Sequence, residues 1–121
     1  TICRAGHNKP IVSIDNDVKL LDSTGIGLGL EKGNIFNTNL KESKLELGKD
    51  NLFVFYSDGL TETMNDKYEE YGESNLLKFI KNNLSLSAEE LKISLLEDIY
   101  SFRNLLEPHD DLTLVIIKYK Q

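Results

Sequence analysis

The segment Leu52–Tyr56, with the sequence LFVFY, constrains the fold of this chain more than any other. Five consecutive apolar or aromatic residues predict a β-strand that is buried on both faces. The run ends abruptly at Ser57-Asp58-Gly59, where Gly59 allows the backbone to turn sharply. Such a strand needs neighbouring strands beside it and an apolar layer on each face, and the rest of the chain has to supply them.

Further strands are predicted on both sides of this segment. Ile11–Ile14 and Val18–Leu21 form the arms of a hairpin around the polar turn Asp15–Asp17. Ile35–Leu47 alternates partly and predicts one or two exposed strands. Leu112–Tyr119 is rich in β-branched and apolar residues, which predicts a closing strand.

Two helices are predicted between the buried strand and the closing strand. The first has Ser74 as its candidate N-cap, and its apolar face consists of Leu76, Leu77, Ile80 and Leu84. The second begins with an S-x-x-E capping box at Ser87 and Glu90, and its apolar face consists of Leu91, Leu95, Ile99, Phe102 and Leu106. The order of elements predicts an α+β fold, a mainly antiparallel sheet with two helices on one face. Few segments remain to cover the opposite face.

Length and charge exclude several classes of protein. A chain of 121 residues with 40% hydrophobic residues fits a single domain over residues 1–121. The net charge of −6 would repel a nucleic-acid backbone. No apolar stretch is long enough for a membrane span. Cys3 is the only cysteine, which excludes an intrachain disulfide and suits a reducing, cytoplasmic compartment.

Carboxylates stand at the ends of two predicted strands. Asp58 follows the buried strand, and Asp110 and Asp111 precede the closing strand. Each signal alone is weak, because Asp-Gly is a common turn and an Asp pair after Pro is usually a solvated loop. If the two strands are antiparallel neighbours, however, Asp58 and Asp110 converge at one edge of the sheet. Converging carboxylates repel each other unless a cation lies between them, and their hard oxygen atoms suit Mg²⁺ or Mn²⁺.

Five segments, in order, resemble the SpoIIE/RsbU branch of the metal-dependent (PPM, 2C-type) protein phosphatases. They are Ala5–Pro10 (A-G-H-N-x-P), Gly25–Leu30 (G-x-x-L-G-L, with Gly27 where Leu or Pro is more usual), Phe55–Glu62 (containing Y-[ST]-D-G-[LV]-T-E), Glu70–Gly72 (E-F-G, here E-Y-G) and Asp110–Leu114 (D-D-[IL]-T-L). The resemblance covers essentially the whole chain.

The resemblance implies an α/β/β/α sandwich with two Mn²⁺ or Mg²⁺ ions in a cleft between the sheets. It implies that a metal-bound water hydrolyses phosphoserine or phosphothreonine in a protein substrate, typically an anti-sigma-factor antagonist in bacterial signalling. The ligands carried over are Asp58 and Asp110, with Asp111 third. His7, Asn8, Gly59 and Thr61 are candidates for the cleft or the substrate loop. A membrane-attached parent is compatible with this family.

The chain departs from the family in what it lacks. A Gly-Asp near a strand start and an Asp-x-x-Gly-His-Gly segment are missing, and the latter supplies a bridging Asp in the family. The first residue is not Met, and Thr1-Ile2-Cys3 has the pattern of a strand already under way. We therefore expect a truncated, C-terminal half of the sandwich whose N-terminal half is a missing partner. With Asp58 and Asp110 alone, it would bind one ion weakly and have little or no phosphatase activity.

Other interpretations stay open beside this one. A non-catalytic interaction or homodimerisation module would use the apolar sheet surface left by the missing half. His7 and Asn8 can simply order their turn, and His109 is expected in an exposed loop; a zinc site from both histidines and the aspartates lacks a spacing signature. Gly25–Gly29 fails the spacing of a nucleotide loop, which favours a turn or a cleft-lining loop, and no G-x-S-x-G elbow of a serine hydrolase occurs. Tyr68 and Tyr71 are expected to be packing residues.

Overall fold

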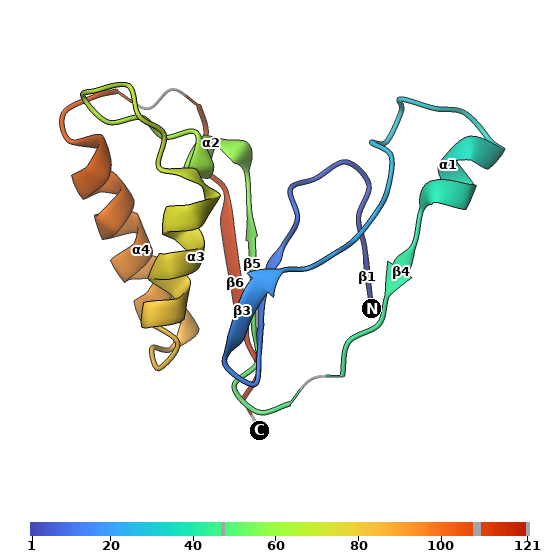
Figure 1. Cartoon of the computed structure of the whole chain (residues 1–121), viewed down its shortest axis with the longest axis horizontal. Helices are drawn as coiled ribbons and strands as arrows, with labels where there is room; N and C mark the ends of the chain where they lie inside the picture. Colours follow the sequence, from blue (N-terminus) through green and yellow to red (C-terminus); the bar gives the residue numbers. More distant parts are fainter. Residues whose placement is uncertain (47, 108–109, 121) are drawn as a thin grey trace.

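The structure, a computed structural model, describes residues 1–46, 48–107 and 110–120. Figure 1 shows its elements. In chain order they are β1 (Ile2–Cys3), β2 (Ile11–Ile14), β3 (Asp17–Leu20), α1 (Asn34–Asn39), β4 (Glu42–Ser43), β5 (Leu52–Tyr56), α2 (Asp58–Thr61), α3 (Gly72–Asn82), α4 (Ala88–Arg103) and β6 (Leu114–Lys118). No helix in the described ranges is both long and apolar enough to cross a membrane.

The main sheet has four strands in the order β3-β2-β5-β6. All its neighbours are antiparallel: β2 pairs with β3 and β5, and β5 pairs with β6. The hairpin and the antiparallel placement of the closing strand beside the buried strand are therefore confirmed. A separate two-stranded sheet joins β1 to β4.

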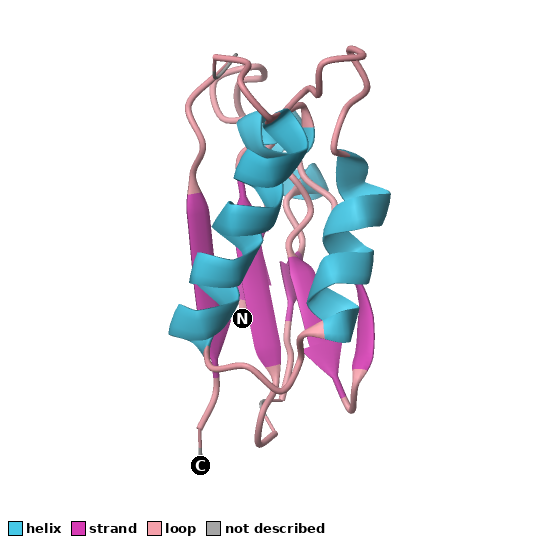
Figure 2. Cartoon of the chain, turned by 90° about the vertical axis from the view of Figure 1, so that its left-hand side faces the viewer, coloured by secondary structure: helices cyan, strands magenta, loops and turns pink. Residues whose placement is uncertain are grey.

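Helices α3 and α4 cover one face of the main sheet, as predicted (Figure 2). Alternate residues of β5, namely Leu52, Val54 and Tyr56, are buried against the apolar faces of both helices. The capping box of α4 is also confirmed, since Glu90 N–H donates to Ser87 Oγ and Ser87 N–H donates to the Glu90 carboxylate.

The opposite face of the sheet has a much smaller apolar cluster. Its buried members are Val12, Leu21 and Phe53, with Ile2, Leu45 and Phe55 packed partly against them. The layer formed by β1 and β4 lies on this side of the main sheet (Figure 1). On β6, Val115 and Ile117 remain 48% and 51% exposed.

Two predicted elements differ from those in the structure. The stretch predicted as exposed strands contains the short helix α1, in which Thr38 Oγ1 donates to Asn34 O at 2.9 Å and Asn39 Nδ2 to Ile35 O at 2.9 Å. Only Glu42–Ser43 is a strand, and Leu47 lies outside the described residues. Helix α3 begins at Gly72, before the predicted cap, and in its first turn the main-chain carbonyl of Tyr71 accepts from Asn75 Nδ2 at 2.7 Å. Ser74 is thus inside the helix, and Leu106 lies beyond the end of α4.

Candidate functional site

The carboxylates predicted to converge stand at one edge of the main sheet. The register pairs Tyr56 with Leu114, so the end of β5 lies beside the beginning of β6. Ser57 continues this contact beyond the strands: its N–H donates to Thr113 O at 3.0 Å, and its hydroxyl accepts from Thr113 N at 2.9 Å. The same hydroxyl donates to Asp111 O at 3.2 Å. Ser57 therefore joins the two acidic segments, a role that sequence reasoning missed.

Both carboxylates are exposed and partly engaged by their own backbone. Asp58 begins α2, and its Oδ1 accepts from Gly59 N at 3.0 Å. Asp110 Oδ1 accepts from Asp111 N at 2.7 Å. Within the described part of the chain no hydrogen bond occupies the Oδ2 atom of either residue. Each side chain is thus oriented by the backbone and keeps one oxygen for a ligand.

Gly59 is required by close approach of the two acidic segments. A Cβ atom at this position would lie 2.5 Å from Asp111 O and 3.4 Å from Asp110 Cβ. Real Cβ contacts at the shorter distance essentially do not occur, so any side chain would push the segments apart. Sequence reasoning found Gly59 as a turn residue, whereas its main constraint is this contact.

The residues fit part of a metal site. Carboxylate oxygens are the ligands that Mg²⁺ and Mn²⁺ prefer, and Asp58 and Asp110 lie at the same end of the β5–β6 pair. No group of three or more His, Cys, Asp or Glu side chains is placed to hold a metal ion in residues 1–46, 48–107 and 110–120. A two-metal site would need further ligands.

Thr61 and Thr63 stabilise the short helix α2 that carries Asp58. Thr61 Oγ1 donates to Asp58 O at 3.1 Å, and the buried Thr63 Oγ1 donates to Gly59 O at 2.8 Å. The Asp58 carbonyl also accepts from Glu62 N–H at 2.8 Å, so the Thr61 bond is its second, whereas the Thr63 bond supplies a partner for the Gly59 carbonyl near the end of this one-turn helix. In this structure the Thr61 hydroxyl therefore acts on the backbone of Asp58.

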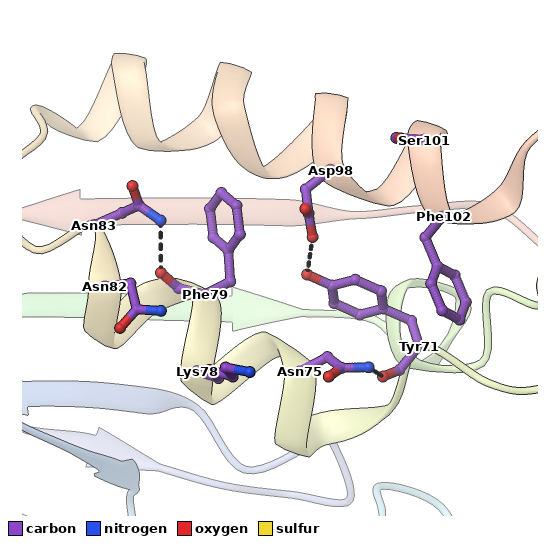
Figure 3. A pocket seen from close by; sticks show the side chains of 9 residues that line it. All are labelled: Tyr71, Asn75, Lys78, Phe79, Asn82, Asn83, Asp98, Ser101 and Phe102. Atoms are coloured by element: carbon purple, nitrogen blue, oxygen red, sulfur yellow. Dashed lines mark hydrogen bonds between the residues drawn. The ribbon is translucent and has the colours of Figure 1, made fainter.

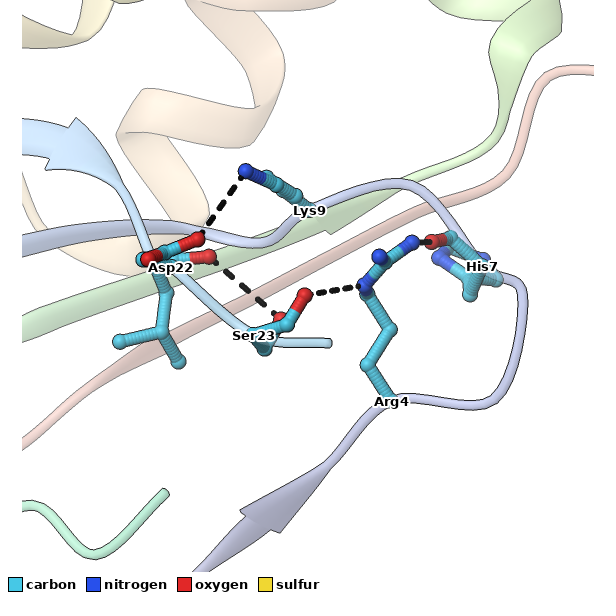
Figure 4. A network of polar contacts seen from close by, with 6 residues as sticks. Arg4, His7, Lys9, Asp22 and Ser23 are labelled. Atoms are coloured by element: carbon cyan, nitrogen blue, oxygen red, sulfur yellow. Dashed lines mark hydrogen bonds and ion pairs between the residues drawn. The ribbon is translucent and has the colours of Figure 1, made fainter. Parts of the chain in front are cut away.

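The loop that contains His7 and Asn8 leads into β2 at the same edge of the sheet. Arg4 anchors it: Nε donates to Ser23 O at 2.9 Å and Nη1 donates to His7 O at 2.7 Å (Figure 4). The exposed His7 ring lies with Nδ1 3.3 Å from Asn8 O. This geometry suits a histidine that orders its own turn. Arg4, which does the anchoring, was not singled out from the sequence.

The glycine-rich loop packs closely against the same segment. A Cβ on Gly25 would lie 1.7 Å from Arg4 O, and a Cβ on Gly6 would lie 2.6 Å from Gly27 Cα. These glycines therefore allow two backbones to touch, which explains the pattern without a bound nucleotide. His109, the other predicted histidine, lies outside the described residues, and the zinc interpretation therefore stays untested.

A hollow of about 790 Å³ adjoins the carboxylates. It lies between the C-terminal part of α4 and the segment after α2, and we call it the Arg103 hollow. Its lining includes the acidic residues Asp110 and Asp111 and the aromatic residues Tyr68 and Tyr100. Tyr68 is 79% exposed, so the expectation that it is a packing residue is wrong. Sequence reasoning missed this hollow because its walls come from segments far apart in the chain.

A second hollow, of about 410 Å³, lies between α3 and α4 (Figure 3). Tyr71 OH donates to Asp98 Oδ2 at 2.6 Å across it, and Asn83 Nδ2 donates to Phe79 O at 2.8 Å. Burial raises the pKa of Tyr71, and the Asp98 carboxylate adds to this shift. The Tyr71 ring is buried and lies edge-on to Phe102, with the ring centroids 5.3 Å apart. Tyr71 is thus a packing residue, as predicted, and this hollow lies away from the carboxylates.

Solved structures share this fold. The SiaA PP2C domain of Pseudomonas aeruginosa matches 94% of this chain and 44% of its own length, with a TM-score of 0.79 and 12% identity. The Mn-presoaked phosphatase domain of SpoIIE from Bacillus subtilis matches 98% of this chain and 49% of its own, with a TM-score of 0.69 and 17% identity. The RsbU and RsbW domains of a Mycobacterium tuberculosis protein match 98% and 31%, with a TM-score of 0.64 and 23% identity. The fold is therefore that of part of a PP2C phosphatase domain, and the chain spans a third to a half of these structures.

The family follows from the sequence itself. The family model described as Stage II sporulation protein E (SpoIIE) matches residues 1–120. The chain belongs to the SpoIIE family, which confirms the resemblance carried by its five motifs. No curated protein sequence matches it.

Proposed function

We propose that this chain is the C-terminal part of a metal-dependent phosphatase domain that hydrolyses phosphoserine or phosphothreonine in a protein. Asp58 and Asp110 would hold Mn²⁺ or Mg²⁺, with Asp111 as a third, weaker candidate. The observation that carries the proposal is the close approach of Gly59, beside Asp58, to Asp110 and Asp111 at the end of the β5–β6 pair, in a chain of the SpoIIE family.

When bound, such ions lower the pKa of a coordinated water and neutralise charge on phosphoryl oxygens. The chain's own residues would position the ions. Backbone N–H groups orient the carboxylates of Asp58 and Asp110, and Ser57 keeps the two segments at a fixed separation. Gly59 adds no side chain between them. The His7–Asn8 loop leads into β2 at the same edge, and in this proposal it would contact the substrate.

We further propose that the remaining metal ligands come from polypeptide outside these 121 residues. Two or three carboxylates are too few for a two-metal site, and the chain spans only 44% and 49% of two of the phosphatase domains that it matches. The isolated chain would then bind one ion weakly and have little or no activity. The parent would act in the cytoplasm.

The substrate we propose is a phosphoprotein of the anti-sigma-factor antagonist type. The support is membership of the SpoIIE family, whose model is described as a sporulation protein, together with the resemblance of the five motifs to the SpoIIE/RsbU branch. The chain's net charge of −6 argues against a nucleic-acid substrate.

Metal binding by the chain tests the proposal directly. Isothermal titration with Mn²⁺ should give weak binding near one ion per chain, and Asp58→Asn or Asp110→Asn should weaken it at least about tenfold. Asp15→Asn is the matched control, because Asp15 is exposed in the turn at the opposite end of β2. Equal Mn²⁺ affinity in all three variants would contradict the assignment of ligands.

Activity tests the incompleteness of the site. A phosphoserine peptide should be hydrolysed in the presence of Mn²⁺ by a parent protein that contains the upstream half, and Asp58→Asn should abolish this. Robust turnover by the 121-residue chain, dependent on Asp58, would show that the site is complete within it.

A second candidate function is a non-catalytic module that pairs with a second copy of itself. The observation that favours it is β6, an edge strand whose Val115 and Ile117 side chains remain about half exposed. A module of this kind would bind its partner without any dependence on Asp58, Asp110 or divalent metal.

A further inference from the structure

The Arg103 hollow is continuous with the carboxylate edge. Three residues at that edge also line the hollow, namely Gly59, Asp110 and Asp111. The phosphorylated residue would be held by the metal that Asp58 and Asp110 are proposed to bind. Its neighbours in the substrate chain would therefore lie at the mouth of this hollow. On this basis, and resting on the proposed function, we propose that the hollow binds the substrate segment that flanks the phosphorylated residue. Arg103 would donate from Nε to a main-chain carbonyl of that segment.

The walls of the hollow suit an apolar side chain. Met64 and Tyr68 come from the segment after α2, Tyr100 comes from α4, and Leu106 follows α4. Tyr100 is 52% exposed and Leu106 is 36% exposed, although both are large. An apolar side chain from a substrate would remove these surfaces from water. Aromatic and Met side chains are common anchors at protein interfaces.

The loop that carries Tyr68 is held in an unfavourable conformation. Tyr68 has a φ of 62°, which is uncommon for a bulky residue. Asn65 fixes the turn, since its Oδ1 accepts from Lys67 N at 2.9 Å and from Glu69 N at 3.0 Å. Strain of this kind persists where the surroundings impose it, and it concentrates at sites of binding. Here it presents an aromatic ring to the opening of the hollow.

Arg103 supplies a polar group without a partner. Its Nε is buried and, among the described residues, has no hydrogen bond. The guanidinium carbon lies 5.3 Å from the centre of the Tyr100 ring, which orients the group over the wall of the hollow. A buried donor without an acceptor costs free energy, and a rotation of the Arg103 side chain that brings Nε to an acceptor in the hollow would recover it.

The charges around the hollow select the kind of acceptor. Glu107, Asp110 and Asp111 all line it, so an acidic substrate side chain would meet three carboxylates. A main-chain carbonyl accepts from Arg103 without that repulsion. We therefore commit to a segment with apolar, non-acidic residues beside the phosphorylated one.

Nuclear magnetic resonance of the isotope-labelled chain with Mg²⁺ tests this inference. The probes are two phosphoserine pentapeptides, one with leucine on each side of the phosphoserine and one with glycine there. We expect the leucine peptide to shift the amide signals of Tyr68 and Tyr100 and the side-chain Nε–H signal of Arg103. The glycine peptide should bind about fivefold more weakly, because it buries no apolar side chain.

Two adjacent leucines give a matched pair of variants. Leu106→Ala, in the wall, should weaken binding of the leucine peptide about fivefold, whereas Leu105→Ala, which is 93% exposed and not in the wall, should not change it. Arg103→Lys keeps the charge but removes the Nε donor, and should weaken both peptides to a similar extent. The amide spectra of the variants also report whether each one is folded.

The outcomes separate this inference from the proposed function. Equal affinity for the two peptides, or no shift at Arg103 with millimolar leucine peptide, would overturn the inference while Mg²⁺ binding at Asp58 and Asp110 stays intact. If the chain instead bound no Mg²⁺ at Asp58 and Asp110 but still bound the leucine peptide more tightly than the glycine peptide, the result would contradict the proposed phosphatase function. Shifts confined to the hollow between α3 and α4 would also overturn the inference.

Discussion

The two faces of the main sheet differ sharply in how well they are covered. On the helix side, α3 and α4 bury a continuous cluster that includes Tyr56 from the centre of the sheet and Leu95, which has no exposed surface. On the other side, Val12, Leu21 and Phe53 are the buried apolar residues of the cluster that the described residues form, and Val115 and Ile117 of β6 stay about half exposed. The main sheet therefore has one face that α3 and α4 cover, which we call the finished face. Its other face, which we call the open face, is covered only in part by the described residues (Figure 1).

This difference explains where the candidate site lies. The finished face stabilises β5 and β6 as neighbours, which places Asp58 and Asp110 at their shared edge. The open face is where a further layer would have to pack, and a layer there could bring additional ligands to the same edge. The chain thus fixes the positions of the candidate ligands Asp58 and Asp110, and we propose that other polypeptide supplies the remaining ones.

The largest expected effect tests the finished face. Leu95→Ala removes a fully buried side chain from α4, so we expect the free energy of unfolding to fall by about 2–5 kcal/mol. Val115→Ala, on the open face, should change it by less than about 0.5 kcal/mol. Urea denaturation followed by circular dichroism measures both. Similar losses in the two variants would show that the open face is as well packed in solution as the helix-covered one.

The next effect concerns the edge between the two faces. Gly59→Ala places a methyl group 2.5 Å from Asp111 O, so we expect a loss of about 1–3 kcal/mol and a shift of the Asp110–Asp111 segment. Gly48→Ala is the control, because its nearest neighbour would be Asn51 Oδ1 at 3.4 Å. Denaturation gives the stability, and amide spectra give the local change. A Gly59→Ala chain as stable as the wild type would mean that the acidic segments are further apart than in this structure.

The elements of the finished face were the ones that the sequence predicted best. The continuous apolar run of β5 and the capping box at Ser87 and Glu90 are both signals that can be read from a short stretch of sequence, although β5 itself is held by pairing with β2 and β6. The polar stretch that contains α1 was predicted wrongly, because α1 buries none of its residues and has no apolar periodicity to identify it. Its six residues are held by side chain-to-backbone bonds from Thr38 and Asn39 instead.

The candidate site also has features that the sequence predicted and features that it did not. The placement of Asp58 and Asp110 at the same end of the β5–β6 pair could be predicted, since it follows from two strong strand patterns and an antiparallel pairing. The contacts of Ser57, the anchoring of the His7 loop by Arg4 and the Arg103 hollow could not. Each depends on tertiary contacts between segments whose spacing in the sequence carries no pattern, or on a single side chain of an ordinary type.

The open face should make the isolated chain associate. An edge strand with two half-exposed apolar residues favours pairing with a second copy, so sedimentation should show a dimer that increases with concentration. Val115→Lys adds a charge there and should weaken association about tenfold, while Lys120→Glu leaves the apolar residues intact. A monomer at all concentrations in the wild-type chain would show that this face is protected in another way.

The smallest expected effect lies at the start of α4 and depends on pH. The main-chain N–H of Ser87 holds the pKa of Glu90 below its ordinary value of 4.5, and the Ser87 side chain adds to this shift. Because the pKa is lowered in the folded state, the carboxylate stabilises the fold above that ordinary value. This stabilisation is lost as the pH falls from 4.5 through the lower, folded-state pKa. Glu90→Gln retains an acceptor for Ser87 N–H but does not titrate, so the stability advantage of the wild-type chain over this variant should shrink across that range.

Glu89→Gln is the control. The Glu89 side chain pairs with Lys92 at 2.8 Å and does not make the bond to Ser87 N–H. Urea midpoints measured on both sides of pH 4.5 give the comparison, and parallel acid profiles for the wild type and Glu90→Gln would place the acid sensitivity of this half of the fold elsewhere.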